Sequence, residues 1–518
     1  SLTIIGRIPT MDEFKVFTAD APEGRRERLL DRLQAAPGRV HHDFIWLSDL
    51  LRVTTRLNDR YPGTAYADWL KERLRSNTHW DVLVREMLTA QGPALAPGNG
   101  ATGFWLRDAG MPLDHMASLT QTFIGTRITC AQCHDHPYDV WKRADFYHLA
   151  AFTNGVNVKR DMPSLNAARK EFKGEATPGE KRILQLLSQT VAVSVQAKPT
   201  GTINLPSDYQ YHDAKPGSAA AAKPLFGVAP VAGDARASFA AWMTDANNPR
   251  FARVIANRVW AWLMGAGLVR SVDNLGTTGE LPSHPELLDH LAQQFVADGW
   301  SIKRLVRTIM LSRTYQLAAS ATPGAAQLDP DNRLFSHANR RRLSAEEIRD
   351  AILWTSGQLD LTIGGPNIGD AGGKSPTSEY GYVYSDKRRS VYTPAFRNQR
   401  LELFEVFDFA DANASIGLRP VTTVAPQALY LMNHPFVIEQ ARLAAERTPA
   451  GAVGDNPARL EQAYRVTLGR GPTAKERALA LQFLSVVIGP DAGQSEQIEG
   501  WAQLHQSLLA CVDFRYLD

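Results

Sequence analysis

Apolar side chains recur at helical spacing along most of this chain. The pattern runs through residues 11–36, 41–57 and 66–90, and returns in the stretch PLDHMASLTQTFI at 112–124. Apolar groups three and four positions apart lie on one side of an α-helix, where a neighbouring element must cover them. Pro112 suits a first helical turn, and Asp114 lies close behind it. We therefore expect a mainly α-helical fold.

The helical pattern resumes after residue 235. Residues 236–269 contain three tryptophans and predict two helices. Ser283, Ser301 and Ser344 each precede an apolar segment as predicted N-caps, and a glutamate follows Ser283 and Ser344 by three residues, as in a capping box. Residues 362–400 are rich in glycine and tyrosine, so they predict a long irregular segment of the kind that is often functional.

The domain organisation follows from length and from a change in composition. A chain of 518 residues is too long for one ordinary core. Residues 161–235 lose the helical pattern and end in a stretch rich in proline, glycine and alanine, which is typical of irregular structure. We predict a helical domain over residues 1–160, an irregular segment with short β-strands over 161–235, and a larger helical domain over 236–518.

Charge and hydropathy argue against nucleic-acid binding and against a transmembrane helix. The net charge of +3 is small for this length and gives no basis for binding nucleic acid. No apolar run approaches the roughly 20 residues of a transmembrane helix. Ser1 opens directly onto an apolar run, and we expect that further residues, including a signal peptide, precede it.

The stretch ITCAQCHDHPYD, residues 128–139, contains a C-x-x-C-H motif formed by Cys130, Cys133 and His134. Two thiols at this spacing can add to the two vinyl groups of one haem, and the adjacent histidine can bind its iron from one face. The motif predicts covalent haem c on Cys130 and Cys133, with His134 as the proximal iron ligand. Cys511, the third cysteine, lies in an apolar run and is predicted to be a buried small hydrophobe.

Other interpretations of the motif stay open. Cys130, Cys133, His134 and His136 are four possible zinc ligands, although adjacent residues join one tetrahedron with difficulty and no second ligand pair follows. A reactive dithiol is a further possibility, but the βαβ context of thioredoxin-like folds is absent from the sequence pattern. The same residues could also be ordinary buried groups.

An electron carrier of this kind needs a sixth iron ligand, usually histidine or methionine. Met116 and His115, which lie about four helical turns upstream, are candidates, and so are His284 and His148. The ordinary explanation for Met116 is packing in the core, and the ordinary explanation for His284 is a position at the start of a helix. His136 is better placed for a hydrogen bond in the second shell of the haem than for its opposite face. Without a sixth ligand, the iron would keep an open position.

Polar groups in the second half predict ion pairs or an anion site. Arg253, Asn257 and Arg258 share one predicted helix, and Arg397 and Asn398 precede two glutamates. Such groups could bind a carboxylate, a sulfated sugar or a haem propionate, or they could join helices as buried ion pairs. We find no hydrolase, phosphate-loop or dinucleotide motif. The sequence therefore predicts no catalytic residue and leaves open whether the protein is an enzyme.

Several stretches resemble one known family in order along the chain. QTFIGTRITCAQCHDHPYDVWKRADFYHLAAF is similar to the cytochrome-like domain of large secreted planctomycete proteins, and IIGRIPT resembles the L-x-G-x-P-T near its start. NPRFARVIANRVWAWLMGAGLV, LPSHPELLDHLAQQF, LSRTYQ, NRRRLSAEEIRDAIL, FRNQRLELFEVFDFAD and VTTVAPQALYLMNHPFV resemble the planctomycete-specific companion domain. The resemblance extends from about residue 3 to residue 518.

The resemblance implies a cellular location and a cofactor more than an activity, because neither domain of that family has an assigned biochemical function. It implies one covalent haem c, a periplasmic, extracellular or cell-envelope location, and a redox partner protein or another cytochrome module. Our leading hypothesis is a secreted mono-haem c-type cytochrome that transfers electrons. The alternatives are a haem-free structural or interaction protein of the envelope, with a structural or zinc-binding motif, and a haem enzyme with an open distal site.

Overall fold

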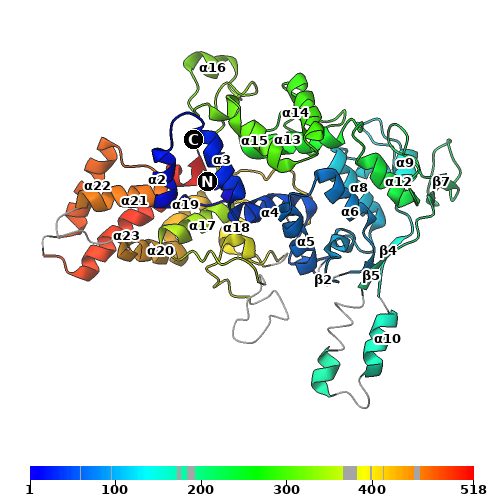
Figure 1. The fold of residues 1–518 in the computed structure, drawn as a ribbon, viewed down its shortest axis with the longest axis horizontal. Helices are drawn as coiled ribbons and strands as arrows, with labels where there is room; N and C mark the ends of the chain where they lie inside the picture. Colours follow the sequence, from blue (N-terminus) through cyan, green and yellow to red (C-terminus); the bar gives the residue numbers. More distant parts are fainter. Residues whose placement is uncertain are drawn as a thin grey trace.

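The computed structural model describes residues 1–58, 60–94, 96–160, 162–171, 177–183, 193–365, 382–396, 399–411, 413–447, 456–489 and 491–517. Helices dominate these residues and the strands are short, which confirms the predicted mainly α-helical fold (Figure 1). Within the described part of the chain, no helix is both long and apolar enough to cross a bilayer.

The first part of the chain is a set of helices that precedes and follows the C-x-x-C-H motif. Its α-helices are α1 Leu2–Ile5, α2 Met11–Ala19, α3 Arg25–Ala35, α4 Gly38–Leu51, α5 Thr64–Arg75, α6 Trp80–Thr89, α7 Gly103–Leu106, α8 Pro112–Ile124 and α9 Arg143–Ala150, with 3₁₀ turns η1 Gly100–Thr102 and η2 Thr129–Gln132.

Three of the helical stretches expected here are interrupted or shorter than expected. The stretch 11–36 divides into α2 and α3, because Pro22 and Gly24 (φ +65°) lie between them. The stretch 66–90 divides into α5 and α6 at Asn77 (φ +50°). The stretch 41–57 ends as a helix at Leu51.

The segment between the two helical parts forms short strands, as expected, together with the helix α10, Met162–Glu171, which was not expected. The strands β4 Val156–Arg160 and β3 Gly92–Pro93 both pair antiparallel with β5 Val193–Ala197, in the order β3-β5-β4. β6 Thr202–Asn204 pairs with β7 Ala219–Ala221. Within the first helical part, β1 Arg56–Leu57 pairs with β2 Tyr61–Pro62. The helix α10 projects from the body of the molecule in Figure 1.

The second part of the chain is helical again. Its α-helices are α12 Ala235–Met243, α13 Phe251–Met264, α14 Pro285–Ala297, α15 Ile302–Leu311, α16 Pro323–Leu328, α17 Ala345–Thr355, α18 Glu402–Val406, α19 Ala425–Asn433, α20 Pro435–Arg447, α21 Asn456–Leu468, α22 Ala474–Val487, α23 Gln494–Ala510 and α24 Val512–Arg515, with 3₁₀ turns η3 Thr314–Gln316 and η4 Ser390–Tyr392. β8 Arg341–Arg342 pairs with β9 Tyr516–Leu517, which ties the end of the chain to its middle.

Two of the three predicted helix starts are confirmed, and one is wrong. The capping box of Ser344 and Glu347 is present at α17, and the Ser301 hydroxyl accepts the Arg304 backbone N–H at α15. The box expected at Ser283 is wrong, because α14 starts at Pro285 with His284 in the N-cap position. Proline at the first helical position has no backbone N–H that would need an acceptor, and its fixed φ favours the start of a helix.

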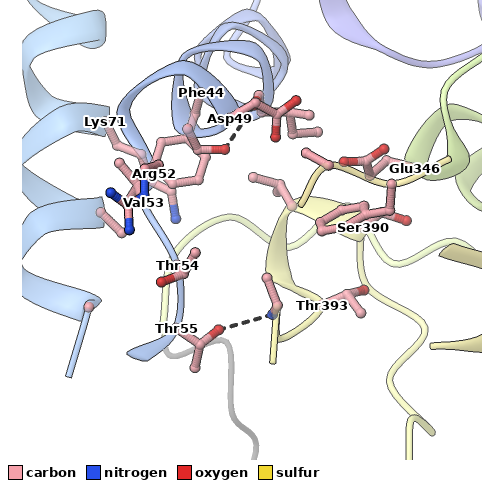
Figure 2. Close-up of a pocket in the computed structure, with 18 of the residues that line it drawn as sticks. Phe44, Asp49, Arg52, Val53, Thr54, Thr55, Lys71, Glu346, Ser390 and Thr393 are labelled. Carbon is pink, nitrogen blue, oxygen red and sulfur yellow. Dashed lines mark hydrogen bonds between the residues drawn. The ribbon is translucent and has the colours of Figure 1, made fainter. Parts of the chain in front are cut away.

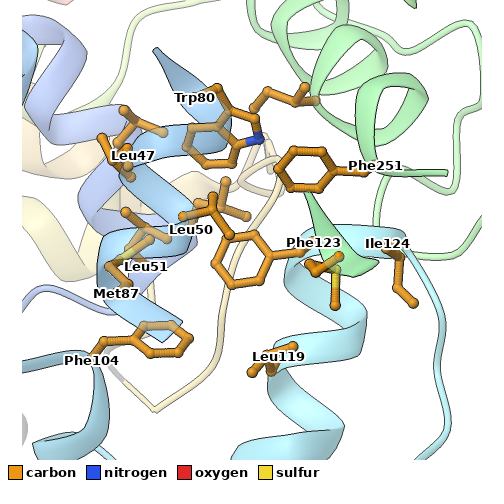
Figure 3. Packing of buried hydrophobic residues seen from close by; sticks show 14 of the residues in the cluster. Leu47, Leu50, Leu51, Trp80, Met87, Phe104, Leu119, Phe123, Ile124 and Phe251 are labelled. Carbon is orange, nitrogen blue, oxygen red and sulfur yellow. The ribbon is translucent and has the colours of Figure 1, made fainter. Parts of the chain in front are cut away.

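One hydrophobic cluster joins residues on both sides of the segment 161–235. In it, the Trp80 ring of α6 lies 6.0 Å from the Phe123 ring of α8 and 6.4 Å from the Phe251 ring of α13, measured between centroids (Figure 3). A second cluster packs α17 to α20 around Ile8, and a third joins α20 to α23. The domain limits inferred from composition stay a prediction, but the largest core crosses the segment that separates them.

Candidate functional site

The C-x-x-C-H motif begins just after a helix, as the sequence predicts. Helix α8 ends at Ile124, and Gly125 caps it in the left-handed conformation, with a φ of +54°. The 3₁₀ turn η2 follows, and the backbone N–H groups of Cys133 and His134 both donate to the Cys130 carbonyl at 3.2 Å. Because residues three apart are eclipsed in 3₁₀ geometry, Cys130 and Cys133 point to the same side of the turn.

The side of η2 that carries the cysteines faces solvent. Cys130 and Cys133 are both exposed, free thiols, whereas Ala131 between them is fully buried in the main core. His134 is exposed beside them. The buried alanine therefore anchors the turn, and the two thiols and the imidazole stay accessible together.

Asp135, which follows the motif, makes three hydrogen bonds, and one of them holds His134. Its carbonyl accepts a bond from His134 Nδ1 at 2.8 Å, and its carboxylate Oδ1 accepts the Arg143 backbone N–H at 2.8 Å. Its own N–H donates to the Tyr211 hydroxyl at 2.7 Å. A carbonyl only accepts, so Nδ1 of His134 must carry the proton, and Nε2 of the neutral ring keeps its lone pair.

His136 closes the loop that follows. Its backbone N–H donates to the Trp141 carbonyl at 2.8 Å, and its Nδ1 accepts the Tyr138 N–H at 3.2 Å. In the neutral ring the proton is then on Nε2, which is a donor. This state suits a hydrogen bond to a haem propionate, and that role of His136 stays a prediction.

The candidates for a sixth ligand lie in other settings. Met116 and His115 are buried in α8, where the His115 Nδ1 bonds Asp108 Oδ2 at 2.9 Å. His284 occupies the N-cap position of α14 and bonds the Ser283 hydroxyl. His148 of α9 bonds the Ala221 carbonyl at 2.7 Å. In the described residues, no hydrogen bond or ring contact joins any of the four to the motif, so a sixth ligand stays unassigned.

Haem c and zinc place different demands on these residues. Covalent haem needs two accessible thiols on one side of a turn and an imidazole nitrogen with a free lone pair, which Cys130, Cys133 and His134 provide. Zinc needs its ligands gathered in one tetrahedron. Over the described ranges, no group of three or more histidine, cysteine, aspartate or glutamate side chains is gathered in that way.

The other polar groups singled out in the sequence are structural where the structure describes them. Arg253 pairs with Asp289 at 2.6 Å, and the Asn257 amide bonds both the N–H and the carbonyl of Val269. Arg258 is 1 % exposed and donates to Asp273 and to the carbonyls of Gln121 and Thr122 in the last turn of α8. Arg397 and Asn398 lie outside the described residues. Cys511 is partly rather than fully buried.

A polar interface between the two helical parts was not predicted from the sequence. Arg419 lies between two carboxylates, Asp49 of α4 and Glu346 of α17, and makes four bonds of 2.6–3.0 Å to them. Burial raises the pKa of Asp49 to about 6, because the loss of hydration outweighs the opposing effect of the Arg419 guanidinium, and the Glu346 carboxylate raises it further.

A small cavity of about 100 Å³ lies beside this ion triad (Figure 2). Phe44, Arg52 and Lys71 line it from the first part of the chain, and Ser390 and Thr393 line it from the second. The Lys71 ammonium lies over the rings of Phe44 and Tyr392, at 4.7 and 5.1 Å, and burial lowers its pKa.

A second cavity, of about 250 Å³, is lined in part by Asp49 and Arg419 of the same triad. Trp46 and Trp262 stack in its wall with centroids 5.0 Å apart, next to His42. His42 is 5 % exposed, and neither ring nitrogen has a hydrogen-bond partner among the described residues. Neither cavity is lined by a residue of the C-x-x-C-H motif.

We expect His42 to make the protein less stable in acid. Burial lowers its pKa to about 3, so the unfolded chain takes up a proton below its ordinary value near 6.5 while the folded chain does not. The stability that His42 contributes is complete above pH 6.5 and is lost as the pH falls towards 3, at about 1.4 kcal/mol per pH unit. Replacing His42 with Gln should remove that slope from urea-unfolding free energies measured at pH 7, 6 and 5.

A matched substitution at an exposed histidine controls for the general effect of acid. His290 of α14 is exposed, and His290→Gln should leave the slope as in the wild type. Equal slopes for H42Q and H290Q would show that His42 is not held neutral by its surroundings.

Comparison with known proteins finds two family models that match this chain. Residues 1–158 match the family model PSCyt2, described as a protein of unknown function (DUF1549). Residues 235–484 match the model PSD1, also described as a protein of unknown function (DUF1553). No curated protein and no solved structure matches the chain. The chain thus matches two planctomycete-type domain families of unknown function, one over each of its helical parts.

Proposed function

We propose that this protein is a mono-haem c-type cytochrome that transfers electrons. The observation that supports the proposal is the arrangement of Cys130, Cys133 and His134: two free thiols on the outward side of one turn, beside an imidazole whose Nε2 keeps its lone pair. Cys130 and Cys133 would hold the haem by thioether bonds, and His134 would bind its iron. When bound, the haem supplies one-electron transfer.

The surroundings of the motif favour exchange of electrons with a partner at the surface. Tyr138 and Val140 follow the motif in the same loop and are 80 % and 66 % exposed. Aromatic and apolar groups beside an accessible redox site are the kind of surface that a partner protein covers. A redox protein or another cytochrome module is therefore the proposed partner, at a periplasmic, extracellular or envelope location where haem c is attached.

The deciding experiment is covalent haem retention. The full chain is produced in the periplasm together with a haem c attachment system, denatured, and measured as the pyridine haemochrome. We expect one haem c per chain that stays with the polypeptide through denaturing electrophoresis. If the chain is colourless and instead retains one zinc per molecule, the proposed cytochrome function is wrong, and the result supports a haem-free envelope protein.

Substitution of the two thiols should abolish the attachment. In the double variant Cys130→Ala, Cys133→Ala the covalent haem should fall from one per chain to none, because no thioether can form. The exposed position of both side chains means that stability should change by less than about 0.5 kcal/mol. Cys511→Ala is the matched control and should keep its haem. Haem that survives denaturation in the double variant would exclude attachment at this motif.

A further inference from the structure

We infer that Asp135 is the positioning residue of the His134 imidazole, and that Tyr211 is what holds Asp135 in place. The inference deepens the proposed function and rests on it, because it concerns the residue proposed as the iron ligand. Neither Asp135 nor Tyr211 belongs to C-x-x-C-H itself, and Tyr211 lies between the two family matches, outside both. The local pattern around the cysteines therefore contains no signal for it.

Asp135 is fixed at all three of its polar groups. The Tyr211 hydroxyl receives its N–H, the Arg143 N–H binds its carboxylate, and its carbonyl is left to accept His134 Nδ1–H. The first two bonds connect Asp135 to Tyr211, which lies 76 residues further along the chain, and to Arg143, which lies 8 residues further along. The carbonyl that meets His134 is thus held by the folded protein and is not merely a neighbour in a flexible loop.

The segment that carries Tyr211 is itself well anchored. Arg143 is 4 % exposed and binds the backbone carbonyl and the carboxylate of Asp208 at 3.1 and 2.7 Å. Tyr209 is 3 % exposed, bonds Asp213 at 2.8 Å, and meets the Tyr211 ring edge to face at 5.5 Å. The Arg143 guanidinium lies over the Tyr209 ring. Residues 208–213 therefore act as a brace that reaches back to the motif.

This brace also has a counterpart on the other side of the motif. The Tyr147 hydroxyl of α9 donates to the Gln132 carbonyl at 3.3 Å, directly before Cys133. One tyrosine thus holds the backbone just before the second cysteine, and another holds it just after His134. The C-x-x-C-H turn is exposed on its outer side, and hydrogen bonds from the inner side fix its backbone.

Fixing the Asp135 carbonyl has a chemical consequence. An imidazole that donates Nδ1–H to a carbonyl is held in the tautomer whose Nε2 is bare, and its orientation is set as well. The same hydrogen bond makes Nε2 a stronger donor to a metal. If Asp135 were free to turn, His134 would share its proton between both nitrogens, as an exposed histidine does in water.

The test removes the Tyr211 hydroxyl with Tyr211→Phe and reads the His134 ring directly. In the haem-free full chain with ¹⁵N-labelled histidine, His134 is assigned by the loss of its signals in His134→Gln. We expect the wild-type ring to be mainly the Nδ1–H tautomer, and Y211F to lower that fraction at least twofold. Tyr138→Phe is the matched control, since it removes a hydroxyl from the loop after the motif that makes no hydrogen bond to Asp135.

A second reading uses the haem-bound chain. If His134 binds the iron, Y211F should keep its covalent haem but shift the midpoint potential upward, because the ligand nitrogen becomes a weaker donor. Equal tautomer fractions and equal potentials in Y211F and Y138F would overturn the positioning role. A wild type without haem, but with the tautomer shift in Y211F, would instead refute the cytochrome and leave the brace in place.

Discussion

A chain that ends after residue 160 will not fold. The core around Trp80 and Phe123 takes Phe251 and other side chains from residues 239–335 as partners, and the strand between β3 and β4 is β5 at residues 193–197. Full burial of one large apolar side chain contributes about 1.5–3 kcal/mol, and whole domains are stable by about 5–15 kcal/mol. Losing only a few such partners removes the entire margin. We expect fragment 1–160 to show no cooperative thermal transition and to bind a dye for exposed apolar surface.

The matched control keeps both parts of the chain but cuts the covalent link between them. Pro216 and Gly217 are exposed, and a protease site inserted between them can be cut after folding. The cut chain should elute as one species in size-exclusion chromatography, because the shared core holds the pieces together. Two separate, folded pieces would mean that the parts before and after the cut are independent domains.

The helices of this protein follow from local patterns, and so they could be predicted. The spacing of Met116, Leu119 and Phe123 places all three on the buried side of α8, and Ser344 and Glu347 cap α17 within three residues of each other. Helix ends were harder, because a residue such as Gly24 acts through its backbone conformation rather than through periodicity. The motif was evident for the same reason as the helices, since its chemistry lies within five consecutive residues.

Contacts between distant segments could not be predicted from the sequence. Tyr211 reaches Asp135 across 76 positions, and Arg419 reaches Asp49 across 370. A hydroxyl or a guanidinium has many possible partners in a chain with 57 basic and 54 acidic residues, and only the fold selects one. The grouping of residues into separate domains was inferred from composition, which does not register that apolar faces on both sides of a linker cover each other.

Replacing Arg419 with Met will lower the free energy of unfolding by about 3–5 kcal/mol at pH 7. The guanidinium compensates Asp49 and Glu346, both of which are almost fully buried where α4 meets α17. Methionine fills a similar volume but leaves two carboxylates facing each other without a cation. The measurement is urea unfolding of the full chain, followed by tryptophan fluorescence.

The pH dependence distinguishes lost charge compensation from lost packing. The pKa of Asp49 is already about 6 in the wild type, and without Arg419 its proton is held over a wider range. A carboxyl whose folded pKa is raised loses stability as the pH rises through that value, so the deficit of R419M should be largest at pH 7 and should shrink towards pH 5. Asp49→Asn is the control, because it leaves Arg419 paired with Glu346 alone, and it should cost less than R419M at pH 7. A deficit that is the same at both pH values would assign the role of Arg419 to packing against Phe409, whose ring lies 4.8 Å from the guanidinium.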